Sequence, residues 1–190
     1  MERRWKKMDF LPKNYKEPDT SNYMRLKQGD NRFRVLSSAI TGMELWKTTE
    51  NGRKPVRFHM DEKIPIKDLE EDKEGNLVMP KTFWAFVVWN YQSEKIQILE
   101  LTQTTIRKKI LALTKNKAWG NPREYDITIT REGDGFDTNY TVMPNPKKEF
   151  DKGIIKLAKD MNINLNALYD GEDPFKNNKT NNTEDKRAEL

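Results

Sequence analysis

The segment 82–91 constrains the fold of this chain more than any other part of the sequence. Five of its ten residues are aromatic, and valine and alanine fill three of the remaining five positions. Aromatic and β-branched side chains pack well on a pleated sheet, so the segment is expected to form a β-strand. Because successive side chains point to opposite faces and both sets are apolar, this strand must be covered on both sides.

The two faces of this strand receive different assignments. One face carries the residues that we assign to the core, which are Trp84, Phe86 and Val88. The opposite face carries the alternate residues, which are Phe83, Ala85, Val87, Trp89 and Tyr91. For Trp89 and Tyr91 two interpretations stay open: burial in a core, or an exposed platform on which nucleic-acid bases stack.

The segments that follow predict a return strand, one helix and two further strands. Residues 96–101 return after a short polar turn, and apolar residues then recur at helical spacing over 106–113. Alternation of polar and apolar residues predicts strands at 125–131 and 138–143, separated by a glycine-containing loop.

Upstream of the aromatic strand, the sequence predicts a bent strand and a hairpin. Arginine and apolar residues alternate over 32–36, and Gly42 interrupts the extended run that follows, which is typical of a bend. The Asn51-Gly52 pair lies between two extended segments, which is typical of a tight hairpin turn.

This order of strands, with one helix before the last two, is the order of an OB-fold. We therefore predict a mainly β protein: a five-stranded, partly open Greek-key barrel with one helix between strands 3 and 4, plus a C-terminal helix. The expected parts are a basic N-terminal arm (1–21), the OB-fold domain (22–146), a C-terminal helical segment (147–169) and a disordered polar tail (170–190).

The composition removes most catalytic and metal chemistry. The 190 residues include no cysteine and a single histidine, His59, so cysteine-based and paired-histidine metal sites are excluded. The sequence also lacks phosphate-binding glycine motifs and nucleophile motifs. We expect no metal, no cofactor and no enzymatic activity. No apolar run is long enough to span a membrane, and we expect a cytoplasmic protein.

Charge is distributed unevenly along the chain. Residues 1–60 carry 14 basic and 7 acidic side chains, whereas 61–80 carry 3 basic and 7 acidic ones and are expected to form a solvated, mobile loop. The predicted helix over 103–119 has five basic residues and no acidic one. Two interpretations of that helix stay open: a solvated basic face, or a docking surface for an acidic segment, either the 170–175 tip or a neighbouring subunit.

Basic and aromatic residues occur together in the two hairpins that flank the binding face of an OB-fold. A groove for single-stranded nucleic acid needs cations for the phosphates and aromatic faces for the bases. The residues that we predict to bind nucleic acid are Trp46, Lys47, Arg53, Lys54, Arg57, Phe58, Trp89, Tyr91, Arg131, Phe136 and Tyr140.

Five sequence blocks together resemble the single-stranded DNA-binding proteins of tailed bacteriophages. They are NRFRVLSS (31–38), GRKPVR (52–57), FWAFVVWNY (83–91), IQILELTQ (96–103) and YDITITR (125–131). The resemblance runs from residue 23 to residue 144 and implies an OB-fold with a role in phage DNA replication, recombination and repair. The chain departs from that pattern in having no zinc-binding cluster. Its end is also only weakly acidic, with six acidic and four basic residues over 170–190.

We therefore predict a protein that binds and protects single-stranded DNA with little sequence preference. Two alternatives stay open: an RNA-binding OB module, and a phage protein that binds a host protein through its groove or its C-terminal helix. The expected partners are single-stranded DNA, replication or recombination proteins that contact the C-terminal tail, and further copies of the chain on DNA. The segment 170–175 has two interpretations, a partner-recruiting acidic tip or a capped turn that packs Phe175.

Overall fold

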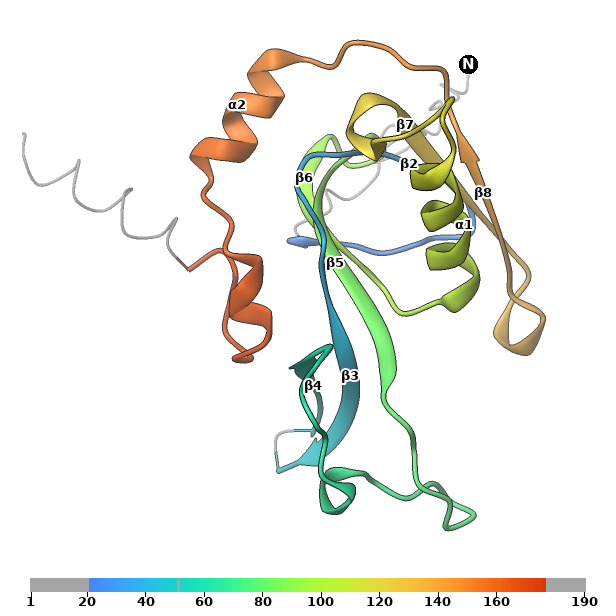
Figure 1. The fold of residues 1–190 in the computed structure, drawn as a ribbon, viewed down its shortest axis with the longest axis vertical. Coiled ribbons are helices and arrows are strands. Elements are labelled where there is room, and N and C mark those ends of the chain that lie inside the picture. The colour runs from blue at the N-terminus through green and yellow to red at the C-terminus, as the bar shows by residue number, and fades with distance from the viewer. Residues whose placement is uncertain (1–20, 51, 177–190) are drawn as a thin grey trace, which may run out of the picture.

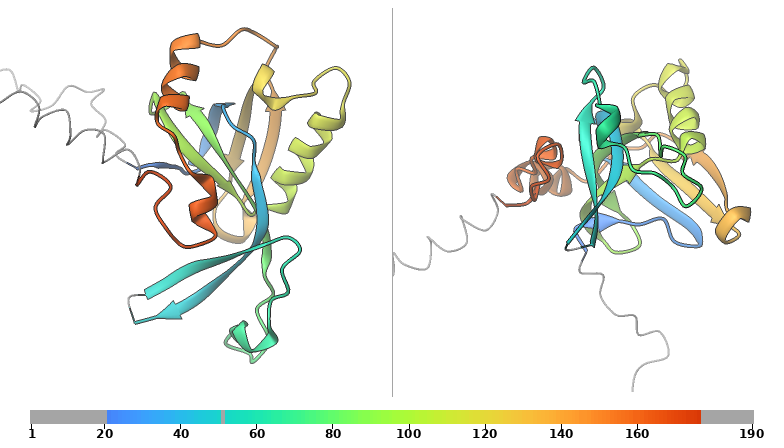
Figure 2. Two further views of the ribbon diagram at one scale, coloured as in Figure 1. Left: turned by 60° about the vertical axis from the view of Figure 1, so that its left-hand side comes forward. Right: turned by 90° about the horizontal axis from the view of Figure 1, so that it is seen from below.

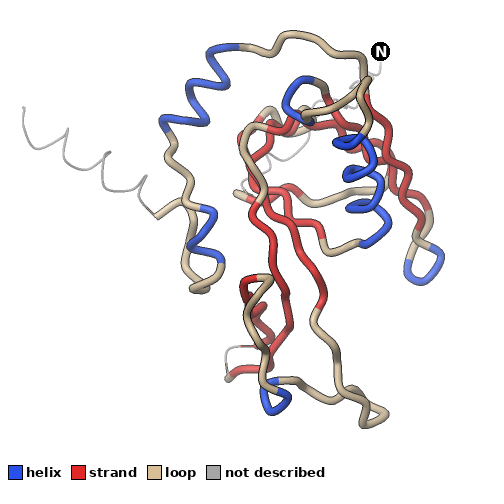
Figure 3. The backbone as a smooth tube through the Cα atoms, in the orientation of Figure 1, coloured by secondary structure: helices blue, strands red, loops and turns tan. Residues whose placement is uncertain are grey.

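One mixed β-sheet organises the computed structural model, which describes residues 21–50 and 52–176 (Figures 1 and 3). The sheet has eight strands: β1 (Tyr23–Met24), β2 (Gly29–Val35), β3 (Ile40–Thr49), β4 (Gly52–His59), β5 (Lys81–Asn90), β6 (Lys95–Leu101), β7 (Asp126–Glu132) and β8 (Asn139–Pro144). The two α-helices are α1 (Thr104–Lys115) and α2 (Lys152–Asp160). Four short 3-10 turns are η1 (Ile66–Asp68), η2 (Pro122–Glu124), η3 (Gly135–Asp137) and η4 (Leu165–Leu168).

The strands pair in the order β1-β6-β5-β2-β7-β8, and the β3–β4 hairpin joins this path through β5. β2 lies at the centre, antiparallel to both β5 and β7, with Phe33 opposite Asn90 on one side and Ile127 on the other. β1 is the exception in direction, because it runs parallel to β6. Segments far apart in the sequence therefore meet at this edge of the sheet.

The β3–β4 hairpin forms an arm that projects from the rest of the sheet (Figures 1 and 2). Only the first half of β3 pairs with β5, from Ile40 opposite Ala85 to Glu44 opposite Lys81. At the root of the arm, Gly42 allows a close approach, since a Cβ atom there would lie 2.2 Å from the backbone oxygen of Phe58. A side chain at this position would force β4 away from β3 at the root of the arm.

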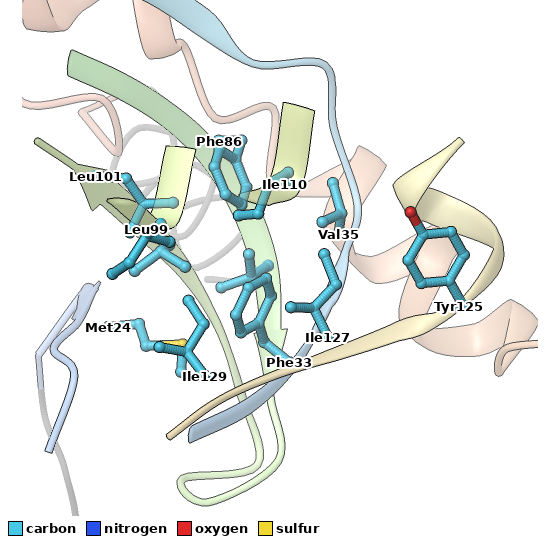
Figure 4. Close-up of a cluster of buried hydrophobic side chains, with 12 residues drawn as sticks. Met24, Phe33, Val35, Phe86, Leu99, Leu101, Ile110, Tyr125, Ile127 and Ile129 are labelled. Atoms are coloured by element: carbon cyan, nitrogen blue, oxygen red, sulfur yellow. The ribbon is translucent and has the colours of Figure 1, made fainter. Parts of the chain in front are cut away.

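One face of the sheet packs with α1 into an inner core (Figure 4). Ile106 and Ile110 of the helix are buried against the strands. The strand residues of this core are Phe33, Val35, Phe86, Val88, Leu99, Leu101, Ile127 and Ile129. The core assignment of the Trp84 face of the aromatic strand is confirmed, with Trp84 itself half-buried at the margin.

The opposite face of the sheet packs against the C-terminal part of the chain. Phe83, Ala85 and Ile98 are fully buried there. α2, η4 and the segment that follows cover them, and Figures 1 and 2 show these elements on the side of the sheet away from α1. Phe175 is 6% exposed in this outer core, and its backbone N–H donates to Asp173 Oδ1 at 2.9 Å. Of the two interpretations of 170–175, the structure shows the capped turn that packs Phe175.

The structure confirms a mainly β chain with one helix between the strand pairs, and it corrects three details. The sheet has eight strands rather than five, because β3 continues into an arm and β1 pairs with the edge of β6. α1 ends at Lys115, four residues before the predicted stop, because Asn116 has extended backbone angles. Residues 170–176 of the predicted tail form turns, and Phe175 among them packs in the outer core.

Several expectations fall on the parts of the chain that lie outside the described residues. They are the arm over 1–20, the hairpin residue Asn51 and the tail over 177–190. Within the described ranges, neither helix has the length and apolar composition that crossing a membrane requires.

Phe175→Ala tests the outer core. We expect the free energy of unfolding to fall by roughly 3 kcal/mol, because the truncation leaves a cavity between the C-terminal segment and the sheet. Leu157→Ala is the matched control, since Leu157 on α2 is 53% exposed and its loss should change stability by less than about 0.5 kcal/mol. Chemical denaturation measures both, and equal stability of the two variants would contradict this packing.

Candidate nucleic-acid interface

A groove of about 670 Å³ opens where the arm meets the β1 edge of the sheet. Its lining residues come from β1, β3, β4, β6, β7 and β8, together with the loop after η4. Five of the eleven predicted binding residues line it, namely Trp46, Lys54, Arg57, Arg131 and Tyr140. The β3–β4 arm and the β7–β8 hairpin therefore both contribute side chains to one groove.

The floor of the groove is a buried ion-pair network centred on Arg57. The Arg57 guanidinium donates to Glu100 Oε2 at 2.7 Å and lies 3.1 Å from Glu44 Oε2. It also lies over the ring of Phe83, with 5.5 Å to the ring centroid. Burial raises the pKa of Glu100, and the nearby Glu44 carboxylate adds to that effect while Arg57 opposes it. Arg57 therefore joins the arm to the sheet and is occupied by two carboxylates.

Two cations on the wall of the groove differ from Arg57 in being exposed. Arg25 and Lys54 are both exposed, and neither forms an ion pair in the part of the chain that the structure describes. Arg131 is only partly engaged by other groups of the protein. Its guanidinium donates to the Leu26 backbone oxygen at 3.2 Å and lies 3.8 Å from the exposed Asp134. These three side chains are the cations that a bound polyanion can reach in the groove.

Polar atoms without partners also concentrate in the groove. Within the described ranges, four buried side-chain nitrogen or oxygen atoms lack a hydrogen-bond partner. Three of them belong to groove residues: Gln103 Oε1, Arg131 Nε and Arg57 Nε, of which Arg57 Nε lies 3.1 Å from Glu44 Oε2 in the ion pair described above. Buried polar groups are nearly always hydrogen-bonded in native proteins, so Gln103 Oε1 and Arg131 Nε offer one acceptor and one donor to a polar group that enters the groove.

Two of the predicted cations on the arm are already paired with the acidic segment 61–80. Lys47 Nζ lies 3.0 Å from Asp68 Oδ1, and Arg53 lies 3.9 Å from Glu70. Glu70 also accepts a hydrogen bond from the Thr48 backbone N–H, which holds the pKa of that carboxyl below its usual value. The acidic segment was expected to be only a solvated loop, but its carboxylates dock on the arm.

The remaining predicted residues lie outside the groove. Phe58 is half-buried on β4, where side-chain alternation places it on the face opposite Arg57. Phe136 is fully exposed in η3 at the tip of the β7–β8 hairpin. Trp89 packs at the margin of the outer core, so its position resembles the buried alternative more than the platform.

Tyr91 belongs to a cluster built around the buried carboxylate of Asp126. Its hydroxyl donates to Asp126 Oδ1 at 3.0 Å, and Arg34 Nε donates to the same oxygen at 2.6 Å. Arg32 and Lys148 also pair with Asp126, and their charges lie over the Tyr91 ring. Burial raises the pKa of Tyr91 to about 12, and the Asp126 carboxylate adds to the shift. The ring is enclosed by charged groups and is poorly placed to stack on a base.

Sequence reasoning missed Arg25 and Gln103 in the groove and the whole Asp126 cluster. Arg25 lies in a segment that carries no binding motif, and Gln103 stands at the start of the predicted helix over 103–119. The cluster joins residues 92 to 94 positions apart, and no local pattern signals such a pairing. The parallel β1–β6 pairing that brings Arg25 to the groove has no local signal either.

Comparison with known proteins adds an independent observation. No known family's sequence model matches the chain, and no solved structure matches it significantly. A curated protein of Escherichia phage T5, "Probable ssDNA-binding protein", is 28% identical to the chain over 151 residues. The resemblance to phage single-stranded DNA-binding proteins is confirmed. The name describes a binding protein and not an enzyme, in agreement with the sequence-based prediction.

The match does not extend over the whole relative. It covers 70% of this chain but 58% of the phage T5 protein, so the chain spans less than two thirds of that protein's length.

The substitution Asp126→Asn tests the role of the buried carboxylate in the Asp126 cluster. Loss of the carboxylate leaves the 2% exposed Arg34 side chain without a counter-charge, and we expect the free energy of unfolding to fall by roughly 3 kcal/mol. Glu124→Gln is the control, because Glu124 pairs with Lys147 at the surface and such pairs contribute under about 1 kcal/mol. Equal effects of the two substitutions on urea denaturation would contradict the assigned role of Asp126.

The difference in stability between the wild-type protein and Asp126→Asn is predicted to depend on pH. Burial alone would raise the pKa of Asp126, but hydrogen bonds from Arg32 and Arg34 outweigh it and hold the pKa below its usual value. The stabilisation by Asp126 is therefore complete above the unfolded-state pKa of about 3.9 and is lost as pH falls through the lower folded-state pKa. The difference in unfolding free energy between wild type and Asp126→Asn should therefore narrow only at pH values below about 3.9. A difference that already narrows near pH 6 would contradict the lowered pKa of Asp126.

Proposed function

We propose that this protein binds single-stranded DNA in the groove between the arm and the β7–β8 hairpin, with little sequence preference. The observation that carries the proposal is the coincidence, in one groove, of unpaired cations, aromatic rings and unsatisfied buried polar atoms. The similarity to the phage T5 protein supports single-stranded DNA as the polymer.

Affinity in this proposal comes first from phosphate contacts. Three cations lie along the groove wall, namely Arg25, Lys54 and Arg131. Arg57 stays paired with carboxylates at the floor of the groove. Contacts to phosphates release condensed counterions and carry no sequence information, which suits a protein that binds exposed strands generally.

Aromatic side chains supply the second contribution. Trp46 is 46% exposed at the groove, where its indole N–H donates to Glu44 Oε1 at 3.1 Å and fixes the ring. Tyr140 lines the same groove from β8, and Tyr23 does so from β1. Bases of any identity can stack on such rings, so stacking adds affinity without strong sequence preference.

We further propose that the sheet is an OB-type barrel with an inserted arm. β2, β5, β6, α1, β7 and β8 follow the OB order, and β7 returns to pair with β2 as that topology requires. In this interpretation the arm occupies the first binding loop and the segment 133–137 the second, so that the groove lies where OB-folds bind oligonucleotides. The biological role is then the protection and organisation of exposed strands during phage DNA replication, recombination and repair.

A salt titration with a fluorescent dT oligomer tests the phosphate contacts. Three groove cations predict a slope of about −2 for log K against log salt, at roughly −0.7 per contact on single strands. Lys54→Ala should reduce the slope by about 0.7, whereas Lys152→Ala on α2 should leave it unchanged. A slope that is unaffected by Lys54→Ala would contradict the groove as the binding site.

Trp46→Ala tests the stacking contact. Affinity for the dT oligomer should fall by about 1–3 kcal/mol, while the melting temperature changes little because the ring is half exposed. Phe136→Ala is the matched control, an exposed aromatic ring outside the groove, and we expect its affinity to match wild type. A larger loss from Phe136→Ala than from Trp46→Ala would move the stacking site to the hairpin tip.

A further inference from the structure

Beyond the groove, two surfaces of this chain complement each other in charge. We propose that copies of the chain join head to tail, with the acidic turn over 71–79 of one copy docked in the apolar cavity beside α1 of the next. The observations behind each surface are independent of the DNA-binding groove.

The first surface is a cavity of about 420 Å³ between α1 and the connection from β2 to β3. Its apolar lining residues include Val35, Trp84, Phe86, Ile110, Leu111 and Ile127, and no acidic residue lines it. Leu111 stands at its rim and is 40% exposed. An apolar cavity that opens to solvent beside a helix is a typical recess for a partner's side chains.

Arg123 lines this cavity, and further basic residues lie next to its rim on α1. Residues three and four positions from Leu111 share its helix face, and these are Arg107, Lys108, Thr114 and Lys115. Lys108 and Lys115 are exposed and form no ion pair among the described residues. α1 has no acidic residue, so the rim attracts an acidic segment.

The second surface is an ordered acidic turn beyond the arm. Glu71 and Leu77 form a β-bridge, and the Asp72 carboxylate accepts hydrogen bonds from the backbone N–H groups of Glu74 and Asn76. The turn presents three exposed carboxylates, on Glu71, Asp72 and Glu74, beside the exposed apolar residues Leu77, Val78 and Met79. Met79 is 67% exposed, so an apolar side chain large enough to enter a recess is available.

The two surfaces lie apart within one molecule. In Figure 1 and in the left view of Figure 2, the turn lies beyond the lower end of the arm, while α1 packs against the sheet. The occupant we assign is therefore the turn of a second copy. A contact between two different surfaces is heterologous, and a heterologous contact that does not close generates an open chain of subunits. Such a chain suits a protein that coats a strand, and this consequence rests on the proposed function.

Charge reversal with rescue tests the contact in the full-length protein. The variant Lys108→Glu/Lys115→Glu should lose self-association in sedimentation velocity and should lose cooperative clustering on long poly(dT) by about fivefold or more, the lower end of typical coupling strengths. Glu71→Lys/Glu74→Lys alone should show the same loss. The combined four-residue variant should regain clustering, because the charges are exchanged between the two surfaces. Lys152→Glu/Lys156→Glu on α2 is the matched control, with the same change of net charge at another exposed helix.

Binding to a short dT oligomer, which holds a single copy, separates this proposal from the proposed function. We expect the rim variant and the α2 control to bind the short oligomer equally, with equal melting temperatures. Wild-type protein that neither self-associates nor clusters, or a rim variant that clusters like the control, would overturn the contact. If the combined four-residue variant does not regain the clustering that Lys108→Glu/Lys115→Glu loses, the turn over 71–79 is not the occupant of the cavity. Loss of short-oligomer binding by wild type would instead reject the proposed function.

Discussion

The apolar character of both faces of β5 is the constraint on which the rest of this structure depends. One face is covered by α1 and the inner core, and the other is covered by α2, η4 and the segment that ends at Phe175. Burying apolar surface on both sides stabilises the sheet by about 25 cal/mol for each Å² removed from water. With both faces covered, the groove forms at the β1 edge of the sheet, between the arm and the β7–β8 hairpin.

Charge pairing decides which cations are left for a ligand. Arg57 is enclosed by Glu44 and Glu100, and Arg34 by Asp126, so both are structural despite their positive charge. Removing one member of such a buried pair is costly because the other is left uncompensated. Arg25 and Lys54 have no acidic partner among the described residues and face the groove. The basic residues among the first 60 positions are thus divided between those held in buried ion pairs and those exposed in the groove.

Local patterns predicted much of this fold, and long-range partners account for the rest. The two-faced strand, the hairpin around Gly52 and the position of α1 follow from composition and spacing over ten residues or fewer. The pairing of Lys47 with Asp68 and of Arg57 with Glu100 spans 21 and 43 positions, and charge alone does not predict it. For Phe175, a single apolar residue in a polar segment, the local pattern leaves two interpretations open and gives no periodic signal that decides between them.

Photo-cross-linking of a halogenated-uracil dT oligomer to the full-length protein, read by mass spectrometry, tests whether single-stranded DNA lies in the groove between the arm and the β7–β8 hairpin. If single-stranded DNA lies in the edge groove, the cross-linked peptides will contain Trp46 and Tyr140, whose rings line it. Peptides that contain Trp89 or Tyr91 will stay unmodified, because those rings are packed against the outer core and the Asp126 cluster. Cross-links concentrated at Trp89 and Tyr91, with none at Trp46 or Tyr140, would contradict the account.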